Sequence, residues 1–309
     1  MPIIPSLLDT DLYKFKCGYW VWKYRRDTPV TYKLILRNPD IKLRSYINLG
    51  KLIDELGSML CLRFSDLDIE YLRRDGVFDE EYLTFLSNFR LSPYILKVND
   101  DYELSFSGKW SEVIYWETFA MSIISELYSR DQADSGHYNR LRRTLKAKLE
   151  VLRANPGIKF IDFGTRRRYS KEWHEEVIRR LQLICPDNFL GTSNVYFAKT
   201  FGIPAMGTMA HEVFMGEAAC SSDWVSNLLG SQVRLLAQWA RWFGLDGVLL
   251  SDTFGTPSFL QQMLAAQIWK GFRQDSGDPS VFAETVISWY EGLGVDPKTK
   301  TIVFSDDLN

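Results

Sequence analysis

The stretch Lys159-Phe-Ile-Asp-Phe-Gly-Thr-Arg-Arg-Arg168 decides the fold, because a short apolar run passes directly into a small polar turn that opens a helical pattern. The same unit recurs downstream. Its apolar runs lie at residues 159–163, 188–190, 203–206, 247–250, 271–273 and 301–304. Short strands that alternate with helical stretches are typical of βα units, so the sequence predicts a parallel sheet.

A polar motif follows each of the six apolar runs. These motifs are Gly164-Thr-Arg-Arg-Arg168, Gly191-Thr-Ser-Asn194, Gly207-Thr-Met-Ala-His-Glu212, Ser251-Asp-Thr-Phe-Gly-Thr256, Gln274-Asp-Ser-Gly-Asp278 and Ser305-Asp-Asp307. In a (β/α) barrel the reactive groups gather at the carboxyl ends of the strands, whereas a doubly wound sheet concentrates them at one switch point. Six polar strand ends therefore favour a barrel.

The first half of the chain follows a different order of elements. We expect a helix over 12–25, a strand over 29–36, helices within 48–90, a strand from 102, a core helix over 110–127 and a basic helix over 138–153. The pattern breaks at Asn155-Pro156-Gly157. The sequence thus predicts an N-terminal α/β domain with helical segments over 1–155 and an incomplete (β/α) barrel with about six recognisable strands over 156–309.

Composition restricts the class of protein. The 309 residues are 46% hydrophobic and carry a formal net charge of -2, which suits a folded chain with a large core. A near-balanced charge provides no general field for nucleic acid or anionic membrane, so we expect neither as a partner. The four cysteines form no CxxC pair, and the N-terminus lacks a signal-peptide pattern, so we expect a cytoplasmic protein.

The polar turns are suited to binding phosphate and a cation. Gly-Thr and Ser-Asp-Thr turns present backbone N–H groups and hydroxyls to anions. Carboxylates occur in the same motifs, at Asp162, Asp252, Asp275, Asp278, Asp306 and Asp307. Phosphate donors beside carboxylates predict a phosphorylated substrate with Mg²⁺. The alternative is that these aspartates and serines only cap the helices that follow.

Two arginines are candidates for binding an anionic ligand. Three consecutive arginines cannot all face one ligand, so we expect Arg166 to point inward and Arg168 to have a structural role. Arg273 lies inside an apolar strand, two residues before Asp275, and the strand period of two places both on one face. A guanidinium binds carboxylate or phosphate through two parallel hydrogen bonds.

Of the three histidines, one lies in a catalytic context. His137 and His174 lie in polar helical patterns, so we expect both at the surface without a chemical role. His211 follows the run 203–206 and the Gly207-Thr208 turn, at the predicted mouth of the barrel. A near-neutral pKa permits acid, base or nucleophilic chemistry, including transient phosphorylation. A satisfied structural histidine remains the alternative.

The motifs together closely resemble those of nicotinate phosphoribosyltransferase. The matching segments are Thr10-Asp-Leu-Tyr-Lys14, Ser107-Gly-Lys-Trp-Ser-Glu-Val-Ile-Tyr-Trp-Glu117, Asp162-Phe-Gly-Thr-Arg-Arg-Arg168, Gly191-Thr-Ser-Asn194, Gly207-Thr-Met-Ala-His-Glu212, Ser251-Asp-Thr-Phe-Gly255 and Arg273-Gln-Asp-Ser-Gly-Asp278. The resemblance implies a type II phosphoribosyltransferase that joins nicotinate to phosphoribosyl pyrophosphate. It also implies a homodimer with a shared active site and ATP hydrolysis coupled through a phosphohistidine.

The resemblance also implies roles for individual residues. Phe163 and Tyr13 would sandwich the nicotinate ring, with Tyr13 supplied by the neighbouring subunit. The remaining substrate-binding residues would be Arg166, Thr192, Arg273, Ser276 and Gly277. His211 would be phosphorylated, and Asp252 and Asp275 would act in catalysis beside Mg²⁺, with the metal ligands unassigned.

This sequence differs from the family at the C-terminal end of the predicted barrel. Members of the family continue beyond Phe304-Ser-Asp-Asp307 with a further strand and a Gly-rich turn that binds the ribose 5-phosphate. Residues 156–309 are too few for a full eight-unit barrel of roughly 250 residues, so we expect this segment to be missing. The alternatives are therefore a catalytically impaired fragment or binding remnant, or a related enzyme acting on nicotinamide or quinolinate.

Overall fold

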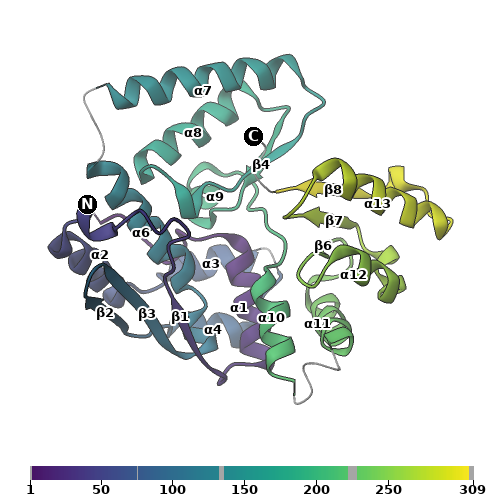
Figure 1. Ribbon diagram of the computed structural model, residues 1–309, viewed down its shortest axis with the longest axis horizontal. Helices are drawn as coiled ribbons and strands as arrows, with labels where there is room; N and C mark the ends of the chain where they lie inside the picture. Colours follow the sequence, from purple (N-terminus) through teal and green to yellow (C-terminus); the bar gives the residue numbers. More distant parts are fainter. Residues whose placement is uncertain (1, 75, 132–135, 222–227, 306–309) are drawn as a thin grey trace. The chain divides into compact units, whose positions relative to one another are not determined.

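The computed structural model describes residues 2–74, 76–131, 136–221 and 228–305 (Figure 1). The chain divides into two compact units, Met1–Gly207 and Thr208–Asn309. The domain boundary expected near residue 155 stays a prediction. Within the first unit, backbone hydrogen bonds join the segment after β5 to the N-terminus. Leu12 donates to the Ser193 carbonyl at 2.7 Å, and Val195 donates to the Thr10 carbonyl at 2.9 Å.

The first unit contains helices α1 to α9 and strands β1 to β5. The helices are α1 (Leu12–Tyr24), α2 (Leu49–Cys61), α3 (Asp66–Arg74), α4 (Glu80–Ser87), α5 (Trp110–Val113), α6 (Trp116–Asp131), α7 (His137–Ala154), α8 (Lys171–Ile184) and α9 (Val195–Phe201). The strands are β1 (Pro29–Lys33), β2 (Tyr94–Val98), β3 (Tyr102–Lys109), β4 (Phe160–Asp162) and β5 (Phe189–Thr192). Strands β1, β3 and β2 form an antiparallel sheet in that order, while β4 and β5 pair in parallel. The helices and strands expected in this half of the chain are present, except that the helix expected over 110–127 is divided into α5 and α6 and that strand β2 was not expected.

Helix α1 lies at the centre of the first unit. Of its residues from Leu12 to Val21, all but Lys16 are buried, as expected of a helix surrounded by protein. At Gly18 a Cβ atom would lie 2.5 Å from the Tyr115 hydroxyl, so a side chain there would displace the Tyr115 ring. The Tyr115 hydroxyl is itself hydrogen-bonded to Tyr82 within an aromatic core.

Helices α7 and α8 lie side by side in Figure 1 and form a smaller core with the parallel pair. Leu145 and Leu149 from α7 pack with Leu181 from α8 and with Cys185. Phe160 of β4 and Phe189 of β5 pack against the same cluster. The apolar faces of the two helices thus cover the strands that carry the first polar motifs.

The second unit is a small α/β layer. Its helices are α10 (His211–Ala219), α11 (Leu228–Phe243), α12 (Thr256–Gln262) and α13 (Pro279–Gly292), and its strands are β6 (Val248–Leu250), β7 (Gly271–Gln274) and β8 (Thr301–Phe304). The strands form one parallel sheet in the order β6-β7-β8. A Cβ at Gly271 would lie 1.7 Å from the Thr301 carbonyl oxygen, so this position requires glycine. The expected parallel βα units are confirmed, in small sheets that do not close.

The strand expected over residues 203–206 is absent from the described part of the chain. Ala205 instead forms an isolated parallel bridge with Thr192. Proline has no N–H to donate to a ladder, so Pro204 can only accept, and its carbonyl receives the Thr192 N–H at 3.2 Å. This prediction was wrong because a proline interrupts the apolar run.

A buried ion pair attaches the N-terminal segment to the turn after β4. The Arg168 guanidinium donates to both carboxylate oxygens of Asp9, at 2.7 and 2.9 Å. Both side chains are almost fully buried, with exposures of 1% and 0%. The expected structural role of Arg168 is therefore consistent with its contacts. Within the described ranges, no helix is long and apolar enough to cross a membrane.

Replacing Asp9 with Asn should lower the free energy of unfolding by roughly 3 kcal/mol, because removing one partner of a buried pair leaves the other charge uncompensated. Urea unfolding followed by circular dichroism measures the change. The control is Asp27→Asn, which breaks the exposed pair with Lys109 and should leave the urea midpoint unchanged. Equal midpoints for the two variants would contradict the importance of the buried pair.

Candidate active site

The first group of predicted site residues surrounds the turn after β4. Arg166 lies in a short 3-10 helix, Thr165–Arg167, and its Nη1 donates to the Glu117 carboxylate at 2.6 Å. The other oxygen of Glu117 contacts the fully buried Lys14 ammonium. The Arg166 guanidinium also lies 5.9 Å from the centre of the Tyr13 ring. Arg166 is thus oriented by α1 and α6, while 37% of its side chain stays exposed.

The surroundings keep Glu117 ionised and Tyr13 neutral at neutral pH. Burial alone would raise the pKa of Glu117, but the positive charges of Lys14 and Arg166 lower it to about 2. Burial raises the pKa of Tyr13 well above its usual range, helped by the nearby Glu117 carboxylate. Tyr13 is 5% exposed, so its ring lies almost entirely inside the first unit.

Asp162, at the end of β4, bonds to two other segments of the first unit. Its Oδ2 accepts from the Thr192 hydroxyl and from His174 Nε2, both at 2.7 Å. His174 is 3% exposed, so the expectation of a surface histidine was wrong. The helical period already places His174 on the same face as Ile178 and Leu181, and that face is buried.

The remaining predicted residues of the first unit differ in accessibility. Phe163 is 46% exposed, although it directly follows a strand. Thr192 is fully buried, and its hydroxyl is used by Asp162. His137 is half-buried and stacks on Tyr169, with ring centres 4.5 Å apart, so it too is less exposed than expected.

The second group of site residues lies in the second unit, around His211. This histidine is the first residue of α10. Its Nδ1 lies 2.9 Å from the Thr253 hydroxyl, and its Nε2 lies 3.0 Å from Asp275 Oδ2. Both ring nitrogens therefore have partners, and the predicted residues His211 and Asp275 are in direct contact.

Asp275 also bonds to the ends of two strands. Burial alone would raise its pKa, but the hydrogen bond from His211, the charge of Arg273 and the Ser305 hydroxyl lower it to about 2. Arg273 lies 3.3 Å from Asp275, as the strand period predicts. Arg273 Nη1 also donates to the Thr208 hydroxyl at 2.7 Å, so its guanidinium belongs to the His211 group.

Asp252 lies next to this group, at the carboxyl end of β6. Its Oδ2 accepts from the Asp275 N–H at 3.2 Å and from the Ser276 hydroxyl at 2.9 Å. Its Oδ1 is buried and accepts no hydrogen bond from the described residues. Gly277 has a φ of +79°, which favours glycine, and it completes the turn behind Ser276.

Three of the predicted carboxylates do not lie in the group around His211 in the described part of the structure. Asp278 caps α13 and accepts from the N–H groups of Ser280 and Val281. The capping alternative therefore describes Asp278, because its oxygen is used by the helix. Asp306 and Asp307 lie outside the described residues. Among the residues that the structure does describe, no three His, Cys, Asp or Glu side chains form a metal-binding group.

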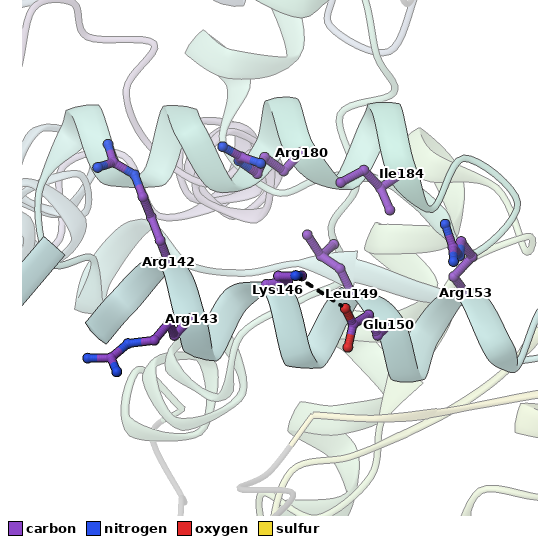
Figure 2. Close-up of a pocket in the computed structure, with 8 residues that line it drawn as sticks. All are labelled: Arg142, Arg143, Lys146, Leu149, Glu150, Arg153, Arg180 and Ile184. Atoms are coloured by element: carbon purple, nitrogen blue, oxygen red, sulfur yellow. Dashed lines mark ion pairs between the residues drawn. The ribbon is translucent and has the colours of Figure 1, made fainter. Parts of the chain in front are cut away.

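A basic groove between α7 and α8 contains none of the predicted site residues (Figure 2). It has a volume of about 380 Å³, with Leu149 and Ile184 among its lining. Arg142 and Arg180, on opposite sides, both bond to Glu176. These contacts join the two helices, so packing between α7 and α8 explains the presence of Arg142 and Arg180.

Comparisons with known proteins define the class of fold first. A crystal structure of nicotinate phosphoribosyltransferase from Vibrio cholerae matches with a TM-score of 0.88 and 31% identity over 100% of this chain and 74% of its own. The corresponding structure from Porphyromonas gingivalis matches with a TM-score of 0.90 and 30% identity over 99% and 79%. The chain therefore has the fold of these phosphoribosyltransferases.

The sequence comparisons identify the family. The model of the nicotinate phosphoribosyltransferase (NAPRTase) N-terminal domain matches residues 8–125, and that of the NAPRTase family matches 158–309. Nicotinate phosphoribosyltransferase from Burkholderia mallei is 37% identical over 99% of this chain and 78% of its own length. The protein from Xanthomonas axonopodis pv. citri is also 37% identical, over 99% and 79%. The chain belongs to the nicotinate phosphoribosyltransferase family.

Glu117 should make the folded chain sensitive to acid. Its pKa is lowered from 4.5 to about 2 by folding, so its stabilising effect is complete above the unfolded value and is lost as the pH falls through about 2. Glu117→Gln should therefore be less stable than the wild type at neutral pH, and the difference should shrink below about pH 5. Thermal unfolding across this range measures it.

The control for this series is Glu150→Gln, since the ion pair that Glu150 forms among the described residues is an exposed one with Lys146 at 3.9 Å. That variant should follow the wild type at every pH. If the stability difference between Glu117→Gln and the wild type stays constant or grows as the pH falls, the lowered pKa of Glu117 is contradicted.

Proposed function

We propose that this protein joins nicotinate to phosphoribosyl pyrophosphate, forming nicotinate mononucleotide and pyrophosphate, with ATP hydrolysis coupled through a phosphohistidine at His211. Relatives with this name, at 35–37% identity over nearly the whole chain, support the reaction. The observation that carries the proposed coupling is the pair of contacts on the His211 ring nitrogens.

These contacts assign a tautomer to His211. Asp275 is ionised at neutral pH and can only accept, so Nε2 carries the proton and donates to it. In the neutral ring, Nδ1 then has the lone pair and accepts from the Thr253 hydroxyl. Nδ1 is therefore the nucleophilic nitrogen, and the Asp275 carboxylate stabilises the positive charge that develops on the ring when Nδ1 reacts.

In the proposed coupling step, Nδ1 attacks the γ-phosphorus of ATP. A P–N bond forms, the bond to the ADP oxygen breaks, and ADP leaves with the electron pair. Water later cleaves the P–N bond and releases inorganic phosphate, which restores the neutral ring. Phosphorylation changes the affinity for the other substrates, so coupling acts through linkage and takes no direct part in glycosidic bond formation.

We propose that Phe163 and Arg166 bind the aromatic acid and that Tyr13 supports them. The exposed Phe163 ring offers a flat apolar surface to a pyridine ring. Arg166 is held by Glu117 through Nη1 and is 37% exposed, so its guanidinium can also bind a ligand carboxylate. Tyr13 is buried against Arg166, which supports a role in orienting the guanidinium.

Transfer of the ribosyl group requires stabilisation of the pyrophosphate leaving group. When bound, Mg²⁺ would neutralise charge on the departing phosphates. The buried Oδ1 of Asp252, which lacks a hydrogen bond from the described residues, is suited to such a cation, and Mg²⁺ commonly takes only one or two carboxylates beside substrate phosphates. The Ser276 hydroxyl and the Asp275 N–H hold this carboxylate in place.

The purified chain should form nicotinate mononucleotide and pyrophosphate in equal amounts from nicotinate, phosphoribosyl pyrophosphate, ATP and Mg²⁺. Chelation with EDTA should stop the reaction, because the pyrophosphate charge is then not neutralised. Chromatographic separation of the products measures the rate. Absence of product from folded, soluble protein would refute the reaction, and preferential use of nicotinamide or quinolinate in competition would refute the choice of base.

Replacing His211 with Asn should abolish ATP hydrolysis and labelling from γ-³²P-ATP, because Nδ1 is removed. The ATP-stimulated part of the rate should disappear, a loss of roughly 5- to 150-fold, while the rate without ATP is retained. The matched control is His137→Asn, which should be labelled like the wild type. Label that persists in His211→Asn, or that resists acid as a phosphoserine does, would contradict the phosphohistidine.

A further inference from the structure

His174 occupies a position that its polar sequence context does not suggest. It lies in the first turn of α8, and its Nε2 is 2.7 Å from Asp162 Oδ2. The edge of its ring packs against Phe197 of α9, with ring centres 4.9 Å apart and planes at 79°. The imidazole is therefore fixed on both sides, by a carboxylate and by an aromatic ring.

Asp162 collects hydrogen bonds from three segments of the first unit. Its carboxylate accepts from His174 in α8, from the Thr192 hydroxyl in β5 and from the Gly164 N–H in the turn, the last at 3.2 Å. Its own carbonyl accepts from the Ser193 N–H at 2.8 Å. Burial alone would raise the pKa of this carboxyl, but His174 and the hydrogen bonds from Thr192 and Gly164 lower it.

The backbone of the turn lies directly against this pair. A Cβ at Gly164 would be 2.9 Å from His174 Nε2 and 3.0 Å from Asp162 Oδ1, so there is no room for a side chain. Phe163 immediately precedes Gly164, and Arg166 follows two residues later. The placement of both side chains thus depends on where the His174–Asp162 pair holds the turn.

The same contacts exclude a direct chemical role for His174. Asp162 is ionised and accepts, so Nε2 carries the proton, and Nδ1 is buried without a hydrogen-bond partner among the described residues. With 3% of the residue exposed, the ring has no access to a ligand.

We infer that His174 is a positioning residue for the aromatic acid substrate, acting through Asp162 and Gly164 to fix Phe163 and Arg166. The inference rests on the proposed function, since it assumes that these two side chains bind nicotinate. It predicts that His174 affects recognition of the base much more than recognition of phosphoribosyl pyrophosphate.

The test compares His174→Leu, which loses the donor, with His174→Gln, which keeps an N–H donor near Nε2. In His174→Leu the KM for nicotinate should rise roughly tenfold or more, because a misplaced turn loses its fit, while the KM for phosphoribosyl pyrophosphate changes less than about twofold. His174→Gln should recover most of the nicotinate KM. The control His137→Leu should leave both values unchanged.

Hydrogen exchange of the turn provides a readout that does not need activity. The peptide covering residues 163–168 should exchange faster in His174→Leu than in the wild type, and His174→Gln should restore its protection. Unchanged exchange, equal rises in both KM values, or failure of His174→Gln to rescue would each overturn the inference. If the wild type makes no nucleotide while the exchange result holds, the proposed function fails and the positioning of the turn stands.

Discussion

A buried guanidinium must be paired, and the first unit is organised around that requirement. Arg168 is 4% exposed and donates to both oxygens of Asp9 and, at 3.0 Å, to the Ile3 carbonyl. Asn194 donates to the same Asp9 carboxylate at 2.7 Å, and its own oxygen caps α9. One charge pair therefore joins the N-terminal segment, the turn after β4 and the start of α9. Without water to replace these partners, the segments have to stay together.

The geometry of the turn gives three consecutive arginines three different environments. The 3-10 helix has three residues per turn, so the side chains of Arg166 and Arg167 point about 120° apart, and the backbone becomes extended at Arg168. Arg166 is half-exposed beside Glu117, Arg167 is exposed, and Arg168 is buried against Asp9. Helix α6 fixes the backbone at both ends of this run, since Ser122 donates to the Thr165 carbonyl at 2.8 Å and Ser125 donates to the Arg168 carbonyl at 3.0 Å. The pairing of Arg168 thus indirectly sets the direction of Arg166.

Periodicity in the sequence predicts the elements well, because strand and helix patterns reflect local burial. The parallel units and the contact of Arg273 with Asp275 follow from the period of two. The strand over 203–206 fails because apolarity alone does not register the missing N–H of Pro204. Asp278 shows a second way in which local sequence is ambiguous. It caps a helix, and an aspartate that caps a helix cannot be distinguished by its local sequence from one that binds a ligand.

Long-range pairing is what the sequence could not supply. His174 is polar and lies among charged residues, yet its partner Asp162 comes from another element. The buried positions Ile178 and Leu181 indicate that this face of α8 points inward, but they do not identify the acceptor. Glu117 and Lys14 occur in the motifs of the family resemblance, although only the fold brings both to Arg166. Their roles depend on contacts between residues about fifty to a hundred positions apart.

The contact with Glu117 explains how the Arg166 guanidinium can be held in one orientation and still be accessible to a ligand carboxylate. Immobilising a free arginine side chain costs up to about 2 kcal/mol of rotamer entropy, which would otherwise be lost when a ligand binds. Glu117 imposes that order before binding, and the buried Lys14 shares its charge, which weakens its competition with an incoming carboxylate. A charged acceptor forms a stronger hydrogen bond with guanidinium than a neutral amide does, roughly by a factor of two. In the proposed site, a preorganised guanidinium of this kind would favour nicotinate over nicotinamide without any steric exclusion of the amide.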